Sequence, residues 1–172
     1  MTTINSTQFT RQIGEHLVAA KLGRLRLFAT PFAGNVPEFD LVVANGYGQS
    51  SLVQVKAING HSWQFSDART FLNIDMVRNE QKQIVQVVKG KKKLSNPNLV
   101  CVFVMLRESE NDEFYIFRLK DLQAIIEKHY KENLKSKNGV RPKNSESTHC
   151  AVSPNDLLKY RDNWPLVLES LA

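Results

Sequence analysis

The sequence feature that most constrains the fold is an almost uninterrupted apolar run at residues 98–106, NLVCVFVML. A strand that is apolar at nearly every position is typically covered on both faces. The run EFYIFRL at 113–119 follows an acidic, polar turn and predicts an antiparallel neighbour. With 172 residues and 42% hydrophobic content, the chain is long enough for one core, so we expect a single domain over 1–172.

Helical spacing of apolar residues predicts two longer helices, at 7–22 and 119–135, and Gly23 is expected to end the first. A C-terminal helical segment is expected from residue 153 onward, because Ser153 can cap a helix that has proline at its first position. Further strands are predicted at 24–30, 38–45 and 51–58, and the last two are expected to form a hairpin. Residues 64–94 fit strand and helix about equally and stay unassigned.

Three polar residues interrupt the short apolar runs of this hairpin: Asp40, Gln54 and Lys56. Residues two apart in a strand point to the same face, so Gln54 and Lys56 are expected to be neighbours in space. A suitable hairpin register also brings Asp40 close to Gln54. Since isolated charges are costly to bury, Asp40 and Lys56 should either pair or be held by a ligand.

The sequence alone leaves two interpretations of Asp40, Gln54 and Lys56 open. In the first, Asp40 and Lys56 form a structural ion pair at a strand end. In the second, Asp40 and the carbonyl oxygen of Gln54, with Glu15 from the first helix, hold Mg²⁺ or Mn²⁺ through the preference of these ions for oxygen ligands. Lys56 would then lie beside a scissile phosphate, where it could orient or deprotonate a nucleophile.

The formal net charge of +6 favours a polyanionic partner, and nucleic acid is the first candidate because clustered cations release counterions from phosphates. The alternative is an ordinary solvated surface. His61 follows the strand that carries Lys56 and is a further candidate for a phosphate contact. The basic residues that we expect to bind nucleic acid, besides His61, are Lys89, Lys91, Lys92 and Lys93.

The segments GEHLVAAKL, PEFDLVV and LVQVKA, taken in order, resemble the PD-(D/E)XK nuclease superfamily. The pattern of that superfamily is a glutamate on the first helix, an aspartate on the second strand, and Glu-x-Lys or Gln-x-Lys on the third. The resemblance implies that Glu15 is the helix acid, Asp40 the principal metal ligand, Gln54 the second strand ligand and Lys56 the catalytic lysine. It covers about the first 60 residues, and Gln54 departs from the commoner Glu.

The resemblance implies an α/β, restriction endonuclease-like fold, in which a central mixed β-sheet is flanked by α-helices. It implies a magnesium- or manganese-dependent endonuclease that hydrolyses phosphodiester bonds of DNA. Two rivals stay open. One is a non-catalytic DNA-binding or assembly module that retains the nuclease fold, and the other is a basic protein-interaction domain in which Asp40 and Lys56 simply pair.

The remaining expectations concern location and assembly. No apolar run approaches the roughly 18 residues that a membrane helix needs, and the first ten residues lack the pattern of a signal peptide. We therefore expect a cytoplasmic protein without a membrane partner, possessing Cys101 as a core residue and Cys150 in a polar stretch. A homodimer is compatible with the sequence, which does not determine the oligomeric state.

Overall fold

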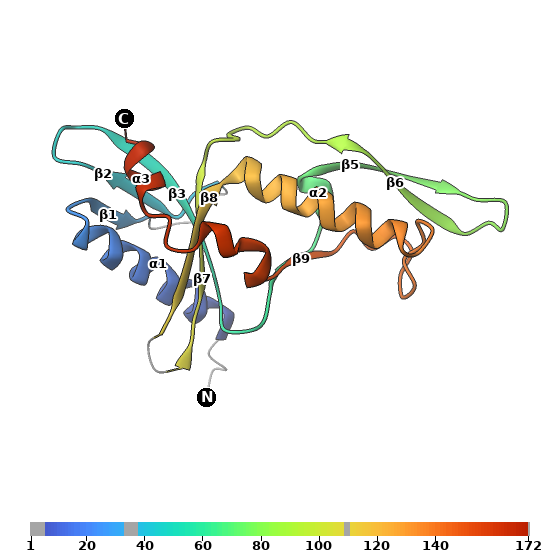
Figure 1. Ribbon diagram of the computed structural model, residues 1–172, viewed down its shortest axis with the longest axis horizontal. Helices are drawn as coiled ribbons and strands as arrows, with labels where there is room; N and C mark the ends of the chain where they lie inside the picture. The colour runs from blue at the N-terminus through green and yellow to red at the C-terminus, as the bar shows by residue number, and fades with distance from the viewer. Residues whose placement is uncertain (1–5, 33–37, 109–110, 172) are drawn as a thin grey trace. The chain divides into compact units, whose positions relative to one another are not determined.

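The computed structural model describes residues 6–32, 38–108 and 111–171, and the chain divides into two compact units. The first unit comprises Met1–Trp63, Asn98–Leu119 and Ser153–Ala172, and the second comprises Gln64–Pro97 and Lys120–Val152. Figure 1 shows the elements of both units along the chain. The expectation of a single domain stays a prediction. Each unit is made of separate segments of the chain, and two such units can belong to one domain.

The first unit is built on a five-stranded mixed sheet with the order β1-β2-β3-β7-β8. The pairs β1–β2, β2–β3 and β7–β8 are antiparallel, whereas β3 and β7 are parallel, so the chain must cross over between them. Strands β3 and β7 therefore lie side by side inside the sheet, and β8, which contains most of the run at 113–119, lies at its edge. The strands are β1 (Phe28–Pro31), β2 (Leu41–Ala44), β3 (Ser50–Ile58), β7 (Val100–Met105) and β8 (Glu113–Arg118).

Helix α1 (Ser6–Arg24) packs against β1 and β3. Its buried residues Val18 and Leu22 join a core that also contains residues of the sheet and of the short helix α3 (Pro165–Glu169). Gly14 allows the close approach, because a Cβ atom at this position would lie 2.3 Å from the Cβ of Ala57. The predicted α/β fold, a central mixed sheet flanked by helices, is confirmed.

Aromatic side chains cover part of the other face of the sheet, on β7 and β8. The buried Trp63 begins the short strand β4 (Trp63–Phe65), and its ring contacts those of Phe103 and Tyr115, with centroids 5.1 and 5.7 Å apart. Its Nε1 donates to the carbonyl oxygen of Lys56, at 2.9 Å. This bond fixes the end of β3 that carries Lys56. The 3-10 helix η3 (Pro154–Tyr160) adds Tyr160, which packs on Phe117 of β8.

The second unit contains an antiparallel hairpin, which we call the ribbon, formed by β5 (Leu72–Arg78) and β6 (Ile84–Lys91). Helix α2 (Leu119–Lys135) lies along it (Figure 1). The hydroxyl of Tyr130 bonds to the buried side chain of Gln86 on β6. The buried Gln123 donates to the carbonyl oxygens of Phe71 and Lys92, at 2.8 and 2.7 Å. Side-chain amides of the ribbon and the helix therefore satisfy polar groups that packing removes from water.

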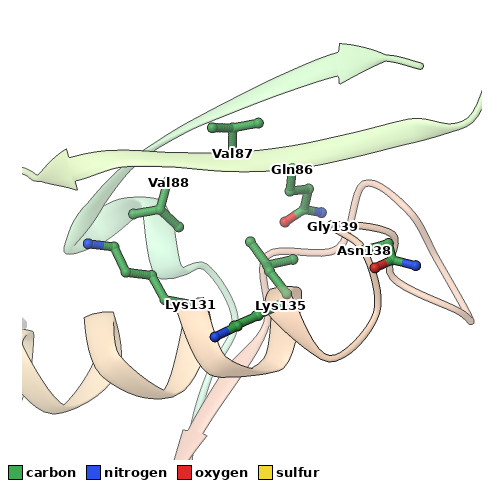
Figure 2. Close-up of a pocket in the computed structure, with 8 residues that line it drawn as sticks. Gln86, Val87, Val88, Lys131, Lys135, Asn138 and Gly139 are labelled. Atoms are coloured by element: carbon green, nitrogen blue, oxygen red, sulfur yellow. The ribbon is translucent and has the colours of Figure 1, made fainter. Parts of the chain in front are cut away.

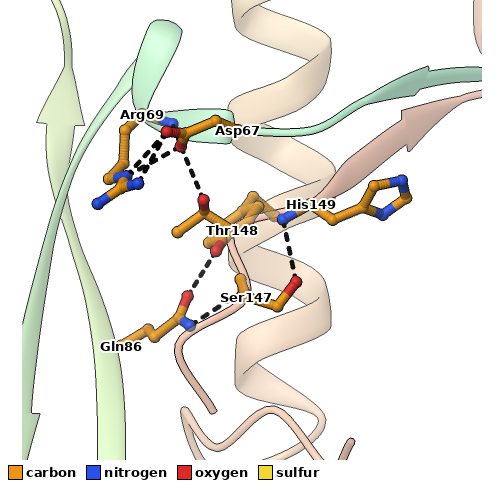
Figure 3. Close-up of polar contacts among 7 residues, drawn as sticks. Asp67, Arg69, Gln86, Ser147, Thr148 and His149 are labelled. Atoms are coloured by element: carbon orange, nitrogen blue, oxygen red, sulfur yellow. Dashed lines mark hydrogen bonds and ion pairs between the residues drawn. The ribbon is translucent and has the colours of Figure 1, made fainter. Parts of the chain in front are cut away.

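Residues 139–149 are tied to this unit by polar contacts (Figure 3). Thr148 donates to Asp67 at 2.7 Å, and Asp67 in turn pairs with Arg69 beside the 3-10 helix η1 (Ala68–Thr70). Gln86 donates to the carbonyl oxygen of Ser147 at 3.1 Å. The segment then enters β9 (Cys150–Val152), which pairs with β4. No helix in the described parts of the chain has the length and apolar character needed to cross a bilayer.

Candidate active site

Asp40 and Gln54 meet where β2 begins beside β3. Leu41 pairs with Val53 in the antiparallel register. Asp40 precedes Leu41 and Gln54 follows Val53, so Asp40 and Gln54 lie opposite each other at the next position. Gln54 Nε2 donates to Asp40 Oδ2, and the backbone N–H of Val55 donates to the same oxygen at 2.8 Å. The backbone N–H of Asp40 donates to Val53 at 2.9 Å. These bonds fix the carboxylate of Asp40 against β3 and leave its second oxygen for another contact.

Lys56 follows two residues after Gln54 and shares its face of β3, since successive strand residues alternate. Its partner in the parallel register is Phe103 of β7. The side chain is half-buried. Burial lowers the pKa of Lys56 below its usual value, and the negative charge of Asp40 opposes this shift without cancelling it. A larger fraction of Lys56 is therefore neutral near physiological pH than for a solvated lysine.

Glu15 projects from α1 and is buried, with 7% of its surface exposed. Arg11 Nε lies 3.0 Å from Glu15 Oε1 as an ion pair. This ion pair is at hydrogen-bonding distance, so the buried oxygen of Glu15 faces the positive charge of Arg11. Burial raises the pKa of Glu15, the charge of Asp40 raises it further, and Arg11 opposes both. The effect of Asp40 on this pKa means that the helix acid lies within electrostatic range of the strand acid.

Arg11 is the site residue that the sequence interpretation missed. Its charge lowers the pKa of Asp40 as well as that of Glu15, although burial leaves the pKa of Asp40 raised overall. The available signal was the spacing of four residues between Arg11 and Glu15, which places both side chains on one face of a helix. Together with Lys56, Arg11 balances the formal charges of the two carboxylates.

The donor atoms fit a hard divalent cation in type. Glu15 offers a buried carboxylate that is paired with Arg11. Asp40 offers a carboxylate whose Oδ2 accepts two hydrogen bonds, and Gln54 offers an amide whose nitrogen donates to Asp40. Oxygen ligands of this kind suit Mg²⁺ or Mn²⁺. Within the described residues there is no group of three or more His, Cys, Asp or Glu side chains that could hold a metal. The fit therefore rests on two carboxylates and one amide.

The residues predicted to bind nucleic acid are spread over both units. His61 is exposed between β3 and β4 in the first unit. Lys89 and Lys91 lie on β6 of the ribbon, where they pair with Asp75 and with Glu127 of α2 at 3.6 and 3.7 Å. Lys92 and Lys93 follow β6 directly and are exposed.

A hollow of about 320 Å³ lies between β6 and α2 in the second unit (Figure 2). Its surface is mostly apolar, and Lys131 and Lys135 stand at its edge. None of the predicted catalytic residues lines it, so this cavity is separate from the Asp40 site. The lining residues are Gln86, Val87, Val88, Lys131, Leu134, Lys135, Asn138 and Gly139.

The chain is therefore an α/β protein. Its candidate site consists of Asp40, Gln54 and Lys56 on the β2–β3 hairpin and Glu15 on α1. No family model and no curated protein matches the chain. The structure of the chain is similar to the solved structure of the bacterial homing endonuclease I-Ssp6803I, with a TM-score of 0.48 and 15% sequence identity. The alignment covers 96% of this chain and 95% of the other. A likeness of this size leaves the activity to be inferred from the residues of this chain.

Proposed function

We propose that this chain is a divalent-metal-dependent nuclease that hydrolyses phosphodiester bonds in DNA. The observation that carries the proposal is the hydrogen bond between Asp40 and Gln54 on adjacent strands, with Lys56 and the buried Glu15 of α1 within electrostatic range of Asp40. A structural ion pair alone would need only Asp40 and Lys56. It would not involve Glu15, a carboxylate that is buried on α1 and paired with Arg11.

Each residue has a distinct task in this proposal. Glu15, Asp40 and the carbonyl oxygen of Gln54 would hold Mg²⁺ or Mn²⁺, which supplies Lewis-acid polarisation of the phosphate and an activated water. Gln54 and Val55 orient Asp40 through their hydrogen bonds. Lys56 in its neutral form can accept the proton of the attacking water, and in its protonated form it stabilises charge that develops on the phosphate.

The charge balance predicts how metal and DNA bind. With Gln54 in place of a carboxylate, the charges of Glu15 and Asp40 are matched by those of Arg11 and Lys56. Such a site binds a free cation weakly, and we expect DNA phosphates to complete the coordination shell. It also repels the polyanionic substrate less than a site with three carboxylates would.

The non-catalytic DNA-binding module remains the second candidate. The observation that favours it is that polar groups of the protein already contact both acids, Asp40 through Gln54 and Val55, and Glu15 through Arg11. In this alternative, those contacts replace the metal, and the basic residues of the chain bind DNA without cleaving it.

A cleavage assay separates the two candidates. Linear, supercoiled, branched and single-stranded DNA are each incubated with the purified chain in Mg²⁺, in Mn²⁺ or in chelator. The nuclease proposal expects at least one DNA form to be cut in metal and none in chelator. If the protein binds DNA yet cuts none of the four forms in either metal, the non-catalytic module is correct.

A further inference from the structure

The two faces of the ribbon have different surroundings. Strand alternation and the register place Leu72 and Ile74 of β5 on the face that also carries Gln86 and Val88 of β6. Gln86 bonds to Tyr130 of α2, so this inner face packs on the helix. The outer face carries the exposed Asn73, Asp75 and Val77 of β5 and Val87 of β6, whose side chain lies on the side of β6 away from α2 (Figure 2). Lys89 is exposed at the irregularity of the ladder, where it has no partner in the register.

The outer face is chemically mixed, unlike a simple lysine patch. It presents an amide, a carboxylate, two branched apolar side chains and an ammonium. Lys89 Nζ lies 3.6 Å from Asp75 Oδ2, but both side chains are more than half exposed, so this ion pair contributes little stability and DNA can replace it. This is the range of groups that can meet base edges, where carboxylates accept from cytosine, lysine donates to guanine and apolar groups contact the thymine methyl.

Basic side chains stand at both ends of the ribbon. Arg78 and Lys82 flank the turn between β5 and β6, and Lys92 and Lys93 follow β6 at the other end. All four are exposed, and the turn also carries one exposed carboxylate, Glu80, so each end keeps an excess of positive charge. Cations at the two ends of a strand pair are placed to contact phosphates on either side of a groove.

The dimensions of the ribbon match one groove of B-form DNA. A two-stranded ribbon fits the major groove, which is about 12 Å wide. Seven residues of extended chain span about 23 Å, or roughly two thirds of a helical turn of DNA. The major groove of A-form RNA is too deep and narrow to be read in this way. Both the charge and the shape of the ribbon therefore favour duplex DNA.

We propose that the β5–β6 ribbon binds in the major groove of duplex DNA, with its outer face on the base edges and its terminal cations on the phosphates. The inference extends the proposed nuclease function by assigning duplex recognition to the second unit. DNA binding by the ribbon does not itself depend on metal or on Lys56. Each proposal can therefore fail while the other holds.

Binding in the major groove is tested by measuring the affinity of the full chain for labelled duplexes, by fluorescence anisotropy in the presence of chelator. Duplex DNA in which glucosylated hydroxymethylcytosine fills the major groove should bind at least tenfold more weakly than the same unmodified sequence. Netropsin, which occupies the minor groove, should leave the affinity within twofold, and an RNA duplex should bind at least tenfold more weakly than DNA. Equal affinity for blocked and unblocked DNA, or for RNA and DNA, would overturn the proposal.

The outer face is tested with a matched pair of variants. Val87→Glu introduces a carboxylate on this face and should weaken duplex binding at least tenfold. Leu158→Glu makes the same change at an exposed apolar position of η3, and should leave affinity within twofold. Circular dichroism verifies that both variants are folded. If a folded Val87→Glu binds duplex DNA as the parent does, or if both variants lose affinity equally, the ribbon is not the element in the groove.

The terminal cations are tested through salt dependence. Replacing Lys92 and Lys93 with Gln should reduce the slope of log affinity against log salt by about two units, since each phosphate contact contributes about 0.9. Lys135→Gln with Lys143→Gln removes the same charge from exposed positions outside the ribbon, and should leave the slope unchanged. Equal slopes for the two double variants would contradict the assignment of the phosphate contacts. A chain that passes these binding tests but never cleaves DNA would refute only the nuclease.

Discussion

Two regions of the chain place an aspartate and a lysine on neighbouring strands, and they differ in burial. In the ribbon, Asp75 and Lys89 pair at 3.6 Å with side chains that are 57% and 58% exposed. At the candidate site, Asp40 and Lys56 are half-buried, and burial shifts the pKa of each toward the neutral form. Exposed pairs contribute roughly 0–1 kcal/mol. Burial, not residue type, therefore separates the electrostatics of Asp40 and Lys56 from those of the exposed pair.

The largest expected effect compares the two lysines. Lys56→Met should reduce the single-turnover rate of DNA cleavage by on the order of a hundredfold or more, because the proposed role of Lys56 lies mainly in the transition state. Its affinity for DNA in chelator should change little. Lys89→Met should weaken DNA binding and leave the rate at saturating enzyme within a fewfold. An equal fall in cleavage rate in both variants, or an unchanged rate in Lys56→Met, would contradict the proposed difference between the two lysines.

The second prediction compares the two aspartates. Asp40→Asn should weaken Mn²⁺ binding at least tenfold, measured by calorimetry with DNA present, because a neutral amide replaces the principal charged ligand. The Asn side chain can still accept from the Val55 N–H, so the fold should be retained. Asp75→Asn makes the same change on the ribbon and should bind Mn²⁺ like the parent. Equal metal affinity in both variants would remove Asp40 from the metal site.

A smaller effect is expected from Gln54→Glu, which places a second carboxylate beside Asp40. Cleavage should be retained, and the Mg²⁺ concentration for half-maximal rate should fall severalfold, because each added charge strengthens oxygen coordination of the cation. Gln54→Met, which has no oxygen, should raise that concentration. A titration of cleavage rate against Mg²⁺ measures both. If neither variant shifts the titration, residue 54 does not contact the metal.

The smallest effect concerns stability and pH at Glu15. Its pKa is raised from the ordinary value of 4.5 in the folded state, mainly by burial and then by Asp40. The folded protein thus binds this proton more tightly than the unfolded chain, so stability declines as pH rises from below 4.5 through the raised pKa. In chelator, Glu15→Gln should raise Tm by a few degrees at pH 8 and lose that advantage at pH 4.

Thermal unfolding at several pH values checks this prediction. Glu132→Gln, at an exposed position on α2, is the control and should leave Tm nearly unchanged at both pH values. A lower Tm for Glu15→Gln at pH 8 would mean that the ion pair with Arg11 outweighs the cost of burying the acid.

Sequence patterns predicted the parts of the fold that local rules determine. Alternation and turn residues located the hairpin of β2 and β3, and its register brought Asp40 to Gln54 as expected. The parallel pairing of β3 with β7 joins residues about 45 apart along the chain, and no local pattern specifies it. Arg11 was missed because an arginine on a helix surface is usually solvated, and only the tertiary position of Glu15 and Asp40 gives it a role.

The expected ends of elements were less accurate where the chain lacks the usual turn residues. Gly23 was expected to end the first helix, but α1 continues to Arg24, and Arg26 takes the left-handed conformation, with φ of 63°. The strand expected at 24–30 therefore begins only at Phe28. The ribbon stayed unassigned for a similar reason. Its turn contains no glycine, and Lys82 adopts the positive φ of 60° that glycine or asparagine commonly supplies.

The most direct test of the proposed centre is metal rescue at Asp40. Asp40→Cys replaces a hard oxygen ligand with a soft thiolate, which favours Cd²⁺ over Mg²⁺. The account predicts that this variant is inactive in Mg²⁺, regains cleavage when Cd²⁺ is added, and that Cd²⁺ gives the parent no such gain. Cleavage by Asp40→Cys at the parental rate in Mg²⁺ alone would show that the Asp40 carboxylate does not bind the catalytic metal, and would contradict the account.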